Sequence, residues 1–480
     1  MKISVIGAGY VGLTTAGCLA EIGHQVFCAD NDTEKLNRLW DGQMPFYEPY
    51  LEEIVERNRK AKRLEFGLTE EGIERAQAIF ICVGTPPLEK GEADLSAIER
   101  VARVIAQRGR GYRLVIEKST VPVQTGRQLK RHLALFKTKD LEYDLASNPE
   151  FLREGAGVED FFHPDRIVIG VETPRALEHI REIYKPVLEQ TFVCPVHPEC
   201  SRQGPPRRVP FLVTDINSAE LVKHGSNAFL AMKISFINLV ADLCEVAGAD
   251  INKVAEGIGL DRRIGSSFLR PGIGFGGFCF PKDLQALVRI AEKLGCNFSL
   301  LKEVEQINLS RCDHFVEKVK KELWVLRGKK IGVWGLAFKP NTDDVRFGPS
   351  LAIIRRLLAE GAEIQAYDPR ALANARRELP EVTYCKDPYE AARGSEAVLL
   401  LTEWDEFSQV DWERLRTLME RPLIFDGRNA LSRGRLASYG FHYVDIGHAA
   451  EVPMAELVGV NPPPPGPSRG TGVQEVRGDG

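Results

Sequence analysis

The stretch KISVIGAGYVG at residues 2–12 decides the fold. A short apolar run leads into three closely spaced glycines, Gly7, Gly9 and Gly12. A helix-like segment follows, and a second apolar run, HQVFCAD, ends at Asp30. The order is strand, tight turn, helix and strand, which predicts the first unit of a parallel α/β sheet.

The glycines have the G-x-G-x-x-G spacing of a dinucleotide-binding turn. The first glycine allows the tight turn, the second lets the backbone approach a pyrophosphate, and the third lets the helix pack on the strand. Asp30 follows about 20 residues later, where a carboxylate can hold ribose hydroxyls and would repel a 2′-phosphate. An ordinary glycine turn is the alternative, but the strand before it and the helix after it favour NAD binding.

Strand and helix patterns alternate along most of the chain and define its organisation. Further apolar runs of the first sheet are expected at 78–84, 114–119, 143–148, 166–170 and 191–196. A long apolar helix is expected over about 214–247, with Gly248 at its end, and the strand–glycine–helix pattern returns at 330. We therefore predict an α/β protein with two Rossmann-like doubly wound domains, joined by a helical middle domain with a long central helix. The predicted bounds are 1–205, 206–327 and 328–455, followed by a disordered tail at 456–480.

Composition excludes several classes of function. The net charge of −4 gives no reason to expect nucleic acid or an anionic membrane as a partner. No signal peptide is recognisable, and no apolar run reaches the roughly 18 residues of a membrane span. The 10 cysteines include no CxxC pair, which favours free thiols in a reducing cytoplasm. His197 between Cys194 and Cys200 resembles half of a metal site, but without a second half we expect no metal.

Two further strand ends are expected to meet the same ligand as the glycine turn. GTPP at 84–87 and STVP at 119–122 each follow a predicted strand. Ligands of doubly wound sheets bind at the carboxyl ends of the strands. Ordinary turns that stop at proline are the alternative.

A second glycine-rich stretch, PGIGFGGFCFPKDLQAL at 271–287, presents a single thiol. Cys279 precedes a predicted helix and has Lys282 nearby, so we expect a lowered pKa and a nucleophilic role. A packed core cysteine is the alternative, which the surrounding glycines disfavour. A thiol beside a hydride acceptor suits the oxidation of an aldehyde to an acid. Attack by the thiol gives a thiohemiacetal, loss of hydride gives a thioester, and water releases the acid.

Other polar side chains could assist this chemistry. Lys223 and Asn227 lie four residues apart in the long helix, where they share a face and could stabilise an oxyanion. A solvated helix edge is the alternative for that pair. Asp283 is a candidate base or a helix-start carboxylate, and Glu154 is a candidate for positioning hydrolytic water.

Together these motifs resemble the UDP-glucose/GDP-mannose dehydrogenase family over about residues 1–455. The matching segments are GAGYVGL, GTPP, KSTVP, NPEFLREG, DFFHPDRIVIG, SAELVKHGSNAFLAMKISF, RIGSSFLRPGIGFGGFCFPKD, WGLAFKPNTDDVR and a final YDP. The resemblance implies an NAD domain, a helical dimerising middle and a C-terminal domain that holds the uridine diphosphate. It also implies a four-electron oxidation of the sugar C6 alcohol by two NAD⁺, with UDP-glucose as the best-fitting substrate.

The resemblance also implies roles for individual residues. Cys279 is the implied nucleophile, Lys223, Asn227 and Asp283 handle the oxyanion and water, and Glu154 and Thr120 assist hydrolysis. The implied NAD site, with the glycines of the first turn, is Gly7, Gly9, Val11, Gly12, Asp30, Lys35, Thr85, Thr120, Glu154, Lys282 and Arg346. The implied sugar-nucleotide site is Glu150, Phe151, Leu152, Arg153, Glu154, Lys223, Asn227, Phe268, Leu269, Arg270, Pro271, Gly272, Gly276 and Lys339, with Arg263 reaching the substrate across a homodimer.

The sequence departs from the family at two places and leaves alternatives open. Phe278 stands where the family usually has serine, and Asn238–Leu239 replaces a frequent Asn-Glu pair. The basic insert at 202–208 has no assigned role. The first alternative is a sister enzyme for GDP-mannose or a UDP-N-acetylhexosamine. The second is a non-catalytic sensor of NAD and nucleotide sugars, which the joint presence of Cys279, Lys223, Asn227 and Asp283 disfavours.

Overall fold

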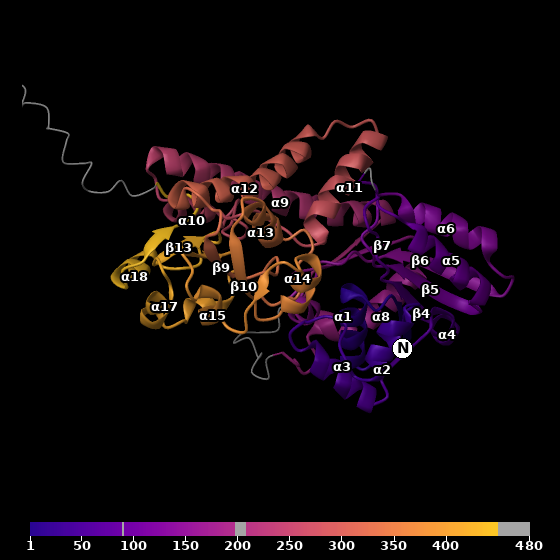
Figure 1. The fold of residues 1–480 in the computed structure, drawn as a ribbon. Coiled ribbons are helices and arrows are strands. Elements are labelled where there is room, and N and C mark those ends of the chain that lie inside the picture. The colour runs from indigo at the N-terminus through magenta and orange to yellow at the C-terminus, as the bar shows by residue number, and fades with distance from the viewer. Residues whose placement is uncertain (89–90, 197–207, 450–480) are drawn as a thin grey trace, which may run out of the picture.

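The computed structural model describes residues 1–88, 91–196 and 208–449. Two mainly parallel sheets lie at opposite ends of the molecule, and a group of helices connects them (Figure 1). The predicted fold class is therefore confirmed. His197, Cys200, residues 202–207 of the basic insert and the tail at 456–480 lie outside the described residues.

The first sheet has eight strands in the order β3-β2-β1-β4-β5-β6-β7-β8 and is parallel except between β6 and β7. Its strands are β1 Lys2–Ile6, β2 Gln25–Ala29, β3 Leu64–Gly67, β4 Ala78–Ile81, β5 Gly111–Glu117, β6 Leu141–Ser147, β7 Ile167–Val171 and β8 Phe211–Thr214. The helices of this part are α1 Tyr10–Glu21, α2 Thr33–Trp40, α3 Leu51–Lys60, α4 Thr69–Arg75, α5 Ser96–Arg108, α6 Thr125–Phe136, α7 Gly157–Phe162 and α8 Pro174–Glu189. The central strands are fully buried because helices cover both faces, as their near-continuous apolar runs require.

The edge of this sheet differs from the prediction. The predicted strand at 191–196 is wrong, and β8 takes the edge position by pairing with β7. Two apolar side chains of the 191–196 segment pack elsewhere: Val196 is buried, and the ring centroid of Phe192 lies 5.0 Å from that of Phe162. The sheet thus continues past residue 205 into the stretch that the sequence assigned to the middle domain.

The second sheet has six parallel strands in the order β11-β10-β9-β12-β13-β14. They are β9 Lys330–Trp334, β10 Glu363–Tyr367, β11 Thr383–Tyr384, β12 Ala397–Leu400, β13 Leu423–Asp426 and β14 His442–Val444. Its helices are α13 Pro349–Ala359, α14 Leu372–Glu378, α15 Pro388–Ala392, α16 Asp405–Ser408, α17 Trp412–Leu418 and α18 Arg433–Ser438. The strand–turn–helix pattern that returns at 330 thus builds a second doubly wound sheet.

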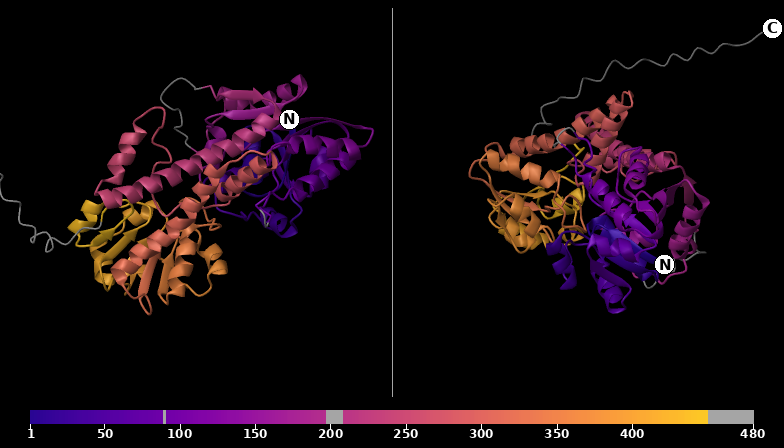
Figure 2. Two further views of the ribbon diagram at one scale, coloured as in Figure 1. Left: turned by 90° about the horizontal axis from the view of Figure 1, so that it is seen from above. Right: turned by 90° about the vertical axis from the view of Figure 1, so that its right-hand side faces the viewer.

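The middle region consists of α9 Ile216–Ala247, α10 Ile251–Gly259, α11 Cys279–Lys293 and α12 Ser299–Leu323. α9 runs from one sheet domain to the other (Figure 2). Asp215 caps it by accepting the amide N–H of Ser218 at 3.0 Å. Gly248 ends it with φ +70°, as predicted. Ile216 joins the core of the first sheet, whereas Ile237 joins that of the second. The helix therefore fixes the relative position of the two domains.

Although α9 is apolar on most sides, it is not buried all round in the single chain. Large apolar side chains remain exposed along one face of the helix, including Phe229, Phe236 and Leu243. The buried face instead carries small and polar residues, among them Lys223 and Asn227.

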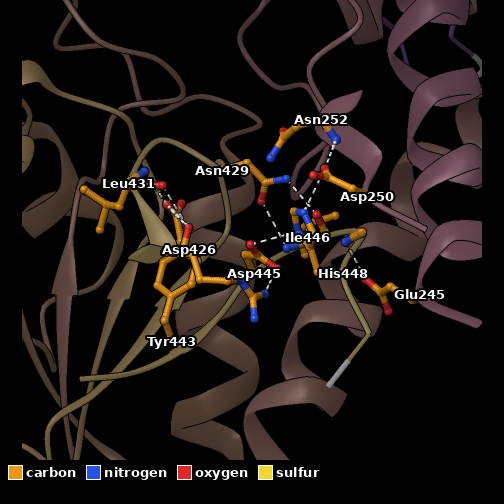
Figure 3. A network of polar contacts seen from close by, with 12 residues as sticks. Glu245, Asp250, Asn252, Asp426, Asn429, Leu431, Tyr443, Asp445, Ile446 and His448 are labelled. Atoms are coloured by element: carbon orange, nitrogen blue, oxygen red, sulfur yellow. Dashed lines mark hydrogen bonds and ion pairs between the residues drawn. The ribbon is translucent and has the colours of Figure 1, made fainter. Parts of the chain in front are cut away.

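A polar network fastens the end of the second sheet domain to the middle helices (Figure 3). The carboxylate of Glu245 accepts the amide N–H of Gly447 at 2.7 Å and pairs with Lys318 at 2.5 Å. The His448 ring lies between Asp250, at 3.1 Å, and Asp445, at 2.9 Å.

No helix within the described ranges is both long enough and apolar enough to cross a membrane.

Candidate active site

The glycine turn between β1 and α1 has the geometry that a dinucleotide requires. Gly7 adopts φ +105°, and a Cβ on Gly12 would lie 1.7 Å from the carbonyl oxygen of Gly7. A Cβ on Gly9 would meet nothing within 4 Å, so this glycine faces open space. No side chain caps the start of α1 and its first turn, which includes Val11, carries no acidic residue. The N-terminus of the helix is therefore available to a phosphate group.

Asp30 follows β2 directly and lies beside this turn. Its carboxylate accepts the amide N–H of Ala8 at 2.7 Å and pairs with Lys35 Nζ at 2.9 Å. Burial opposes ionisation of Asp30. Hydrogen bonds from the backbone N–H groups of Asp32 and Ala8 and from the Lys35 ammonium group nevertheless hold its pKa below the ordinary value. A fixed carboxylate at this position suits two ribose hydroxyls, so these residues fit NAD.

The two other predicted turns meet at the same edge of the sheet. Thr85 Oγ1 donates a hydrogen bond of 2.8 Å to the carbonyl of Thr120, which joins the turn after β4 to the turn after β5. His224 of α9 binds the carbonyl of Val121 through Nε2 at 2.7 Å. The middle helix is thereby attached to the loop that carries Thr120.

Cys279 is the first residue of α11, and its side chain is exposed. The predicted lowering of its pKa is wrong. The surrounding protein withdraws water from the thiolate, Asp283 repels it, and together they raise the pKa of the thiol to about 11 against the attraction of Lys223 and Lys282. The thiol is therefore protonated near neutral pH, although it is accessible to a reactant.

The polar residues predicted around Cys279 are brought together. Asn227 Nδ2 donates to Asp283 Oδ2 at 2.6 Å, and Lys282 Nζ lies 2.6 Å from the other carboxylate oxygen. Lys223, Asn227 and Asp283 are all buried, so the solvated helix edge is excluded for this pair of α9 residues. Burial opposes ionisation of Asp283, but the charges of Lys282 and Lys223 hold its pKa below the ordinary value.

Glu154 and residues of the second sheet domain form a second charged group beside the thiol. Arg346 Nη2 lies 3.9 Å from Glu154 Oε1 and 2.5 Å from Asp344 Oδ2. Burial and repulsion by Asp344 raise the pKa of Glu154 to about 7, although Arg346 and Lys339 oppose the shift. Burial also disfavours the charged form of Lys339, and it therefore lowers the pKa of this lysine. A carboxyl group that titrates near neutral pH is suited to acid–base catalysis.

The segment 150–153 is mostly occupied with contacts inside the protein. Glu150 pairs with Lys118 at 2.7 Å and accepts the amide N–H groups of Phe151 and Leu152. The side chain of Leu152 packs against the first core, and Arg153 forms an ion pair with Asp160 at 2.7 Å. Only the Phe151 ring turns toward α9, with Lys223 Nζ 5.4 Å from its centroid.

The predicted sugar loop at 268–272 leads into the glycines before Cys279. Leu269, Pro271 and Gly272 are buried, whereas Arg270 is exposed. Gly272 donates its amide N–H to Asn238 Oδ1 at 2.8 Å, which gives Asn238 a structural role. A Cβ on Gly276 would lie 2.5 Å from the carbonyl oxygen of Phe347, so this loop packs tightly on the second sheet domain.

Phe268 lies apart from this packing, with its ring centroid 6.2 Å from that of Phe280. Arg263 lies outside the group around Cys279, because its guanidinium is exposed and pairs with Asp261 at 2.6 Å.

Three buried residues that support the site were missed from the sequence. Glu48 accepts the amide N–H groups of Gly155 and Gly157 and the hydroxyl of Tyr10, so it ties the Glu154 loop to the glycine turn. Lys118 holds Glu150, and His224 holds the Val121 carbonyl. Lys118 and His224 each lie next to a predicted site motif, whereas the sequence around Glu48 carries no signal of its contacts.

Comparison with known proteins agrees with this arrangement. Three models of the UDP-glucose/GDP-mannose dehydrogenase family match the chain: the NAD binding domain at 1–188, the central domain at 217–310 and the UDP binding domain at 332–433. A UDP-glucose 6-dehydrogenase of Bacillus subtilis is 43% identical over 95% of this chain and 100% of its own. One of Rhizobium meliloti is 43% identical over 93% of this chain and 99% of its own.

A solved structure is also similar over most of the chain. The UDP-glucose dehydrogenase of the hyperthermophilic archaeon Pyrobaculum islandicum has a TM-score of 0.82 and 37% identity, and the match covers 93% of this chain and 98% of that one. NAD is thus confirmed as the cofactor. The chain belongs to the UDP-glucose/GDP-mannose dehydrogenase family.

Proposed function

We propose that this protein oxidises the C6 alcohol of UDP-glucose to the carboxylate of UDP-glucuronate, with two molecules of NAD⁺. The observation that carries the proposal is the position of Cys279 beside Lys223, Asn227 and Asp283, with Glu154 of the first domain close by. Bound NAD⁺ accepts a hydride in each of the two oxidation steps. The addition of the thiol and the hydrolysis of the thioester are assigned to side chains of the protein.

The raised pKa of Cys279 defines how the thiol adds to the aldehyde. The thiol sulfur bonds to C6 of the aldehyde, and the thiol proton passes to the former carbonyl oxygen, which gives a neutral thiohemiacetal. Lys223 and Asn227 stabilise the negative charge that develops on that oxygen. Loss of the hydride and of the hydroxyl proton then leaves a thioester on Cys279.

Glu154 is assigned to the hydrolysis of this thioester. Its carboxylate takes a proton from the attacking water, the C–S bond breaks, and the thiol of Cys279 regains a proton. Thr120 and Asp283 assist by holding water near the acyl carbon. The pKa of about 7 lets Glu154 accept and release that proton near neutral pH.

The amount of NADH formed per molecule of nucleotide sugar tests the function. With UDP-glucose limiting, we expect two NADH per UDP-glucose, whereas Cys279→Ser should bind substrate and release no acid. Two NADH from GDP-mannose or a UDP-N-acetylhexosamine, and none from UDP-glucose, would assign the chain to a sister enzyme. Binding of NAD and nucleotide sugar without turnover would indicate the sensor.

The exposed face of α9 supports a homodimer. Phe229, Met232, Phe236, Leu239, Leu243 and Val246 follow one another at spacings of three and four residues. This is the apolar pattern of a helix that packs along a second helix. Covering the face with α9 of a second copy would bury these side chains, and the exposed Arg263 would then reach the neighbouring site.

Sedimentation checks this assembly. The wild-type chain should sediment as a dimer at micromolar concentration, and Phe236→Asp should sediment as a monomer, since a charge would enter the apolar contact. Leu135→Asp is the control, because Leu135 is also exposed but lies on α6 of the first domain. We place the enzyme in the cytoplasm, where reducing conditions keep the Cys279 thiol free.

A further inference from the structure

Phe278 directly precedes Cys279 and contacts two cationic side chains. The guanidinium carbon of Arg346 lies 4.6 Å from the centroid of the Phe278 ring, and Lys282 Nζ lies 5.7 Å from it. Both distances are within the range at which the negative face of an aromatic ring attracts a cation. The half-buried ring therefore lies between the chain of α11 and the loop that carries Arg346.

Each of these cations also contacts a carboxyl group of the proposed chemistry. Lys282 pairs with Asp283, and Arg346 lies near Glu154. The stronger partner of Arg346 is Asp344, which accepts hydrogen bonds from Nε and Nη2 at 2.5–3.0 Å and belongs to the same loop. Asp344 therefore orients the guanidinium within its own loop, whereas the Phe278 ring contacts it from the Cys279 side.

Within the described part of the chain, two polar or ring contacts join the Arg346 region to the residues immediately before Cys279. One is the amide N–H of Gly277, which donates to the Arg346 carbonyl at 3.0 Å and positions the backbone. The other is the Phe278 ring, which positions the guanidinium. The Phe278 ring is thus the contact that joins the Arg346 guanidinium to the residues immediately before Cys279.

We infer that Phe278 is a positioning residue, which holds Arg346 next to Glu154 and thereby sets the pH range in which the thioester is hydrolysed. The inference rests on the proposed function, because it assigns the hydrolytic water to Glu154. Burial and Asp344 disfavour ionised Glu154, whereas Arg346 and Lys339 favour it; the Tyr10 hydroxyl and the Cys279 thiol also face this carboxyl group. If Arg346 turns toward solvent, the balance shifts toward the protonated acid.

The test compares the pH dependence of kcat in Phe278→Leu, Phe278→Tyr and the wild type. Leucine keeps an apolar side chain but removes the aromatic face, so the acid limb of the profile should move up by about half a pH unit or more, with a several-fold loss of kcat near neutral pH. Tyrosine keeps the ring and should restore the wild-type limb. A change in KM alone would not fit a residue that acts through Glu154.

Phe136→Leu is the matched control. Arg103 lies 4.6 Å above the Phe136 ring, the same separation as in the Arg346 pair, but on the surface of the first domain. Removal of the Phe136 ring should leave the pH dependence of kcat unchanged. If Phe278→Leu melts at a much lower temperature than the wild type, Phe278→Met provides a second apolar side chain without a ring.

The outcomes separate this inference from the proposed function. Wild-type protein that does not form two NADH per UDP-glucose would refute the function itself. Wild-type protein that does so, with Phe278→Leu or Phe278→Met retaining the wild-type pH profile, would refute the role of Phe278 alone.

Discussion

The thiol of Cys279 shows which of several opposing effects controls its ionisation. A helix N-terminus contributes about 0.3–1 kcal/mol to a nearby negative charge, less than one pKa unit. Loss of water around the thiolate and repulsion from Asp283 raise the pKa of Cys279. Together they outweigh the helix N-terminus and the attraction of Lys223 and Lys282. The position of Cys279 at a helix start was predictable. The direction of its pKa shift was not, because the loss of water around the thiolate and the closeness of Asp283 depend on packing.

The first prediction concerns Asp283→Asn. Removing the carboxylate charge removes a repulsion, so the pKa of Cys279 should fall and the thiol should react faster with iodoacetamide near pH 8. Alkylation of Cys279, followed by peptide mass spectrometry, measures this rate against pH. Cys279→Ser gives the background from other cysteines, and an unchanged pH midpoint in Asp283→Asn would show that desolvation alone controls the thiol.

The second prediction concerns Glu154. If its carboxylate accepts the proton of the hydrolytic water, kcat should fall as pH drops through about 7, where the group becomes protonated. Glu154→Gln should lose this fall of kcat at low pH and should hydrolyse the thioester slowly. Rapid mixing with excess NAD⁺ should then show a burst of two NADH per site before a slow steady rate. A burst of one NADH would instead place Glu154 before the second oxidation.

At the scale of the element, the turn between β1 and α1 separates two uses of glycine. Gly12 is required by packing, because a Cβ there would overlap the Gly7 carbonyl oxygen at 1.7 Å. Gly9 has free space around its missing side chain and an extended backbone, with φ −80°. It is required only if a ligand occupies that space.

The third prediction follows from this contrast. Gly12→Ala should destabilise the protein by more than about 2 kcal/mol, the usual scale of a severe clash in a packed region. Gly9→Ala should melt near the wild-type temperature and yet bind NADH at least several-fold more weakly. Thermal melting and NADH fluorescence titration measure the two effects. Equal NADH affinity in Gly9→Ala would mean that the pyrophosphate lies elsewhere.

The elements that could be predicted are those whose pattern is local. The strands around Gly7 and the C-terminal end of α9 follow from periodicity and glycine. The segment 191–196 was misread because its apolar residues fit a strand equally well, and only packing against Phe162 decides otherwise. The ion pair of Glu150 could not be predicted for a similar reason: its partner, Lys118, lies on a neighbouring strand end.

At the scale of the whole molecule, the site is completed by direct contact between the two sheet domains. Arg346 and Lys339 of the second domain face Glu154 of the first. The amide N–H of Tyr47 donates to Asp343 Oδ1 at 3.3 Å across the same boundary. Because α9 joins both cores, a small change in this contact should alter the electrostatics of Glu154 without unfolding either domain.

The fourth prediction tests that contact through Gly155, which adopts φ +79° and would place a Cβ 2.7 Å from the carbonyl oxygen of Asn341. Gly155→Ala should lose about 1–2 kcal/mol from backbone strain and should also push the second domain away from Glu154. Gly328→Ala is the control, because Gly328 has φ +73° and open space around it. Both variants should melt at similarly lowered temperatures, but only Gly155→Ala should lose kcat and show a higher pH for the acid limb. Equal activity in the two variants would mean that the domain contact does not tune Glu154.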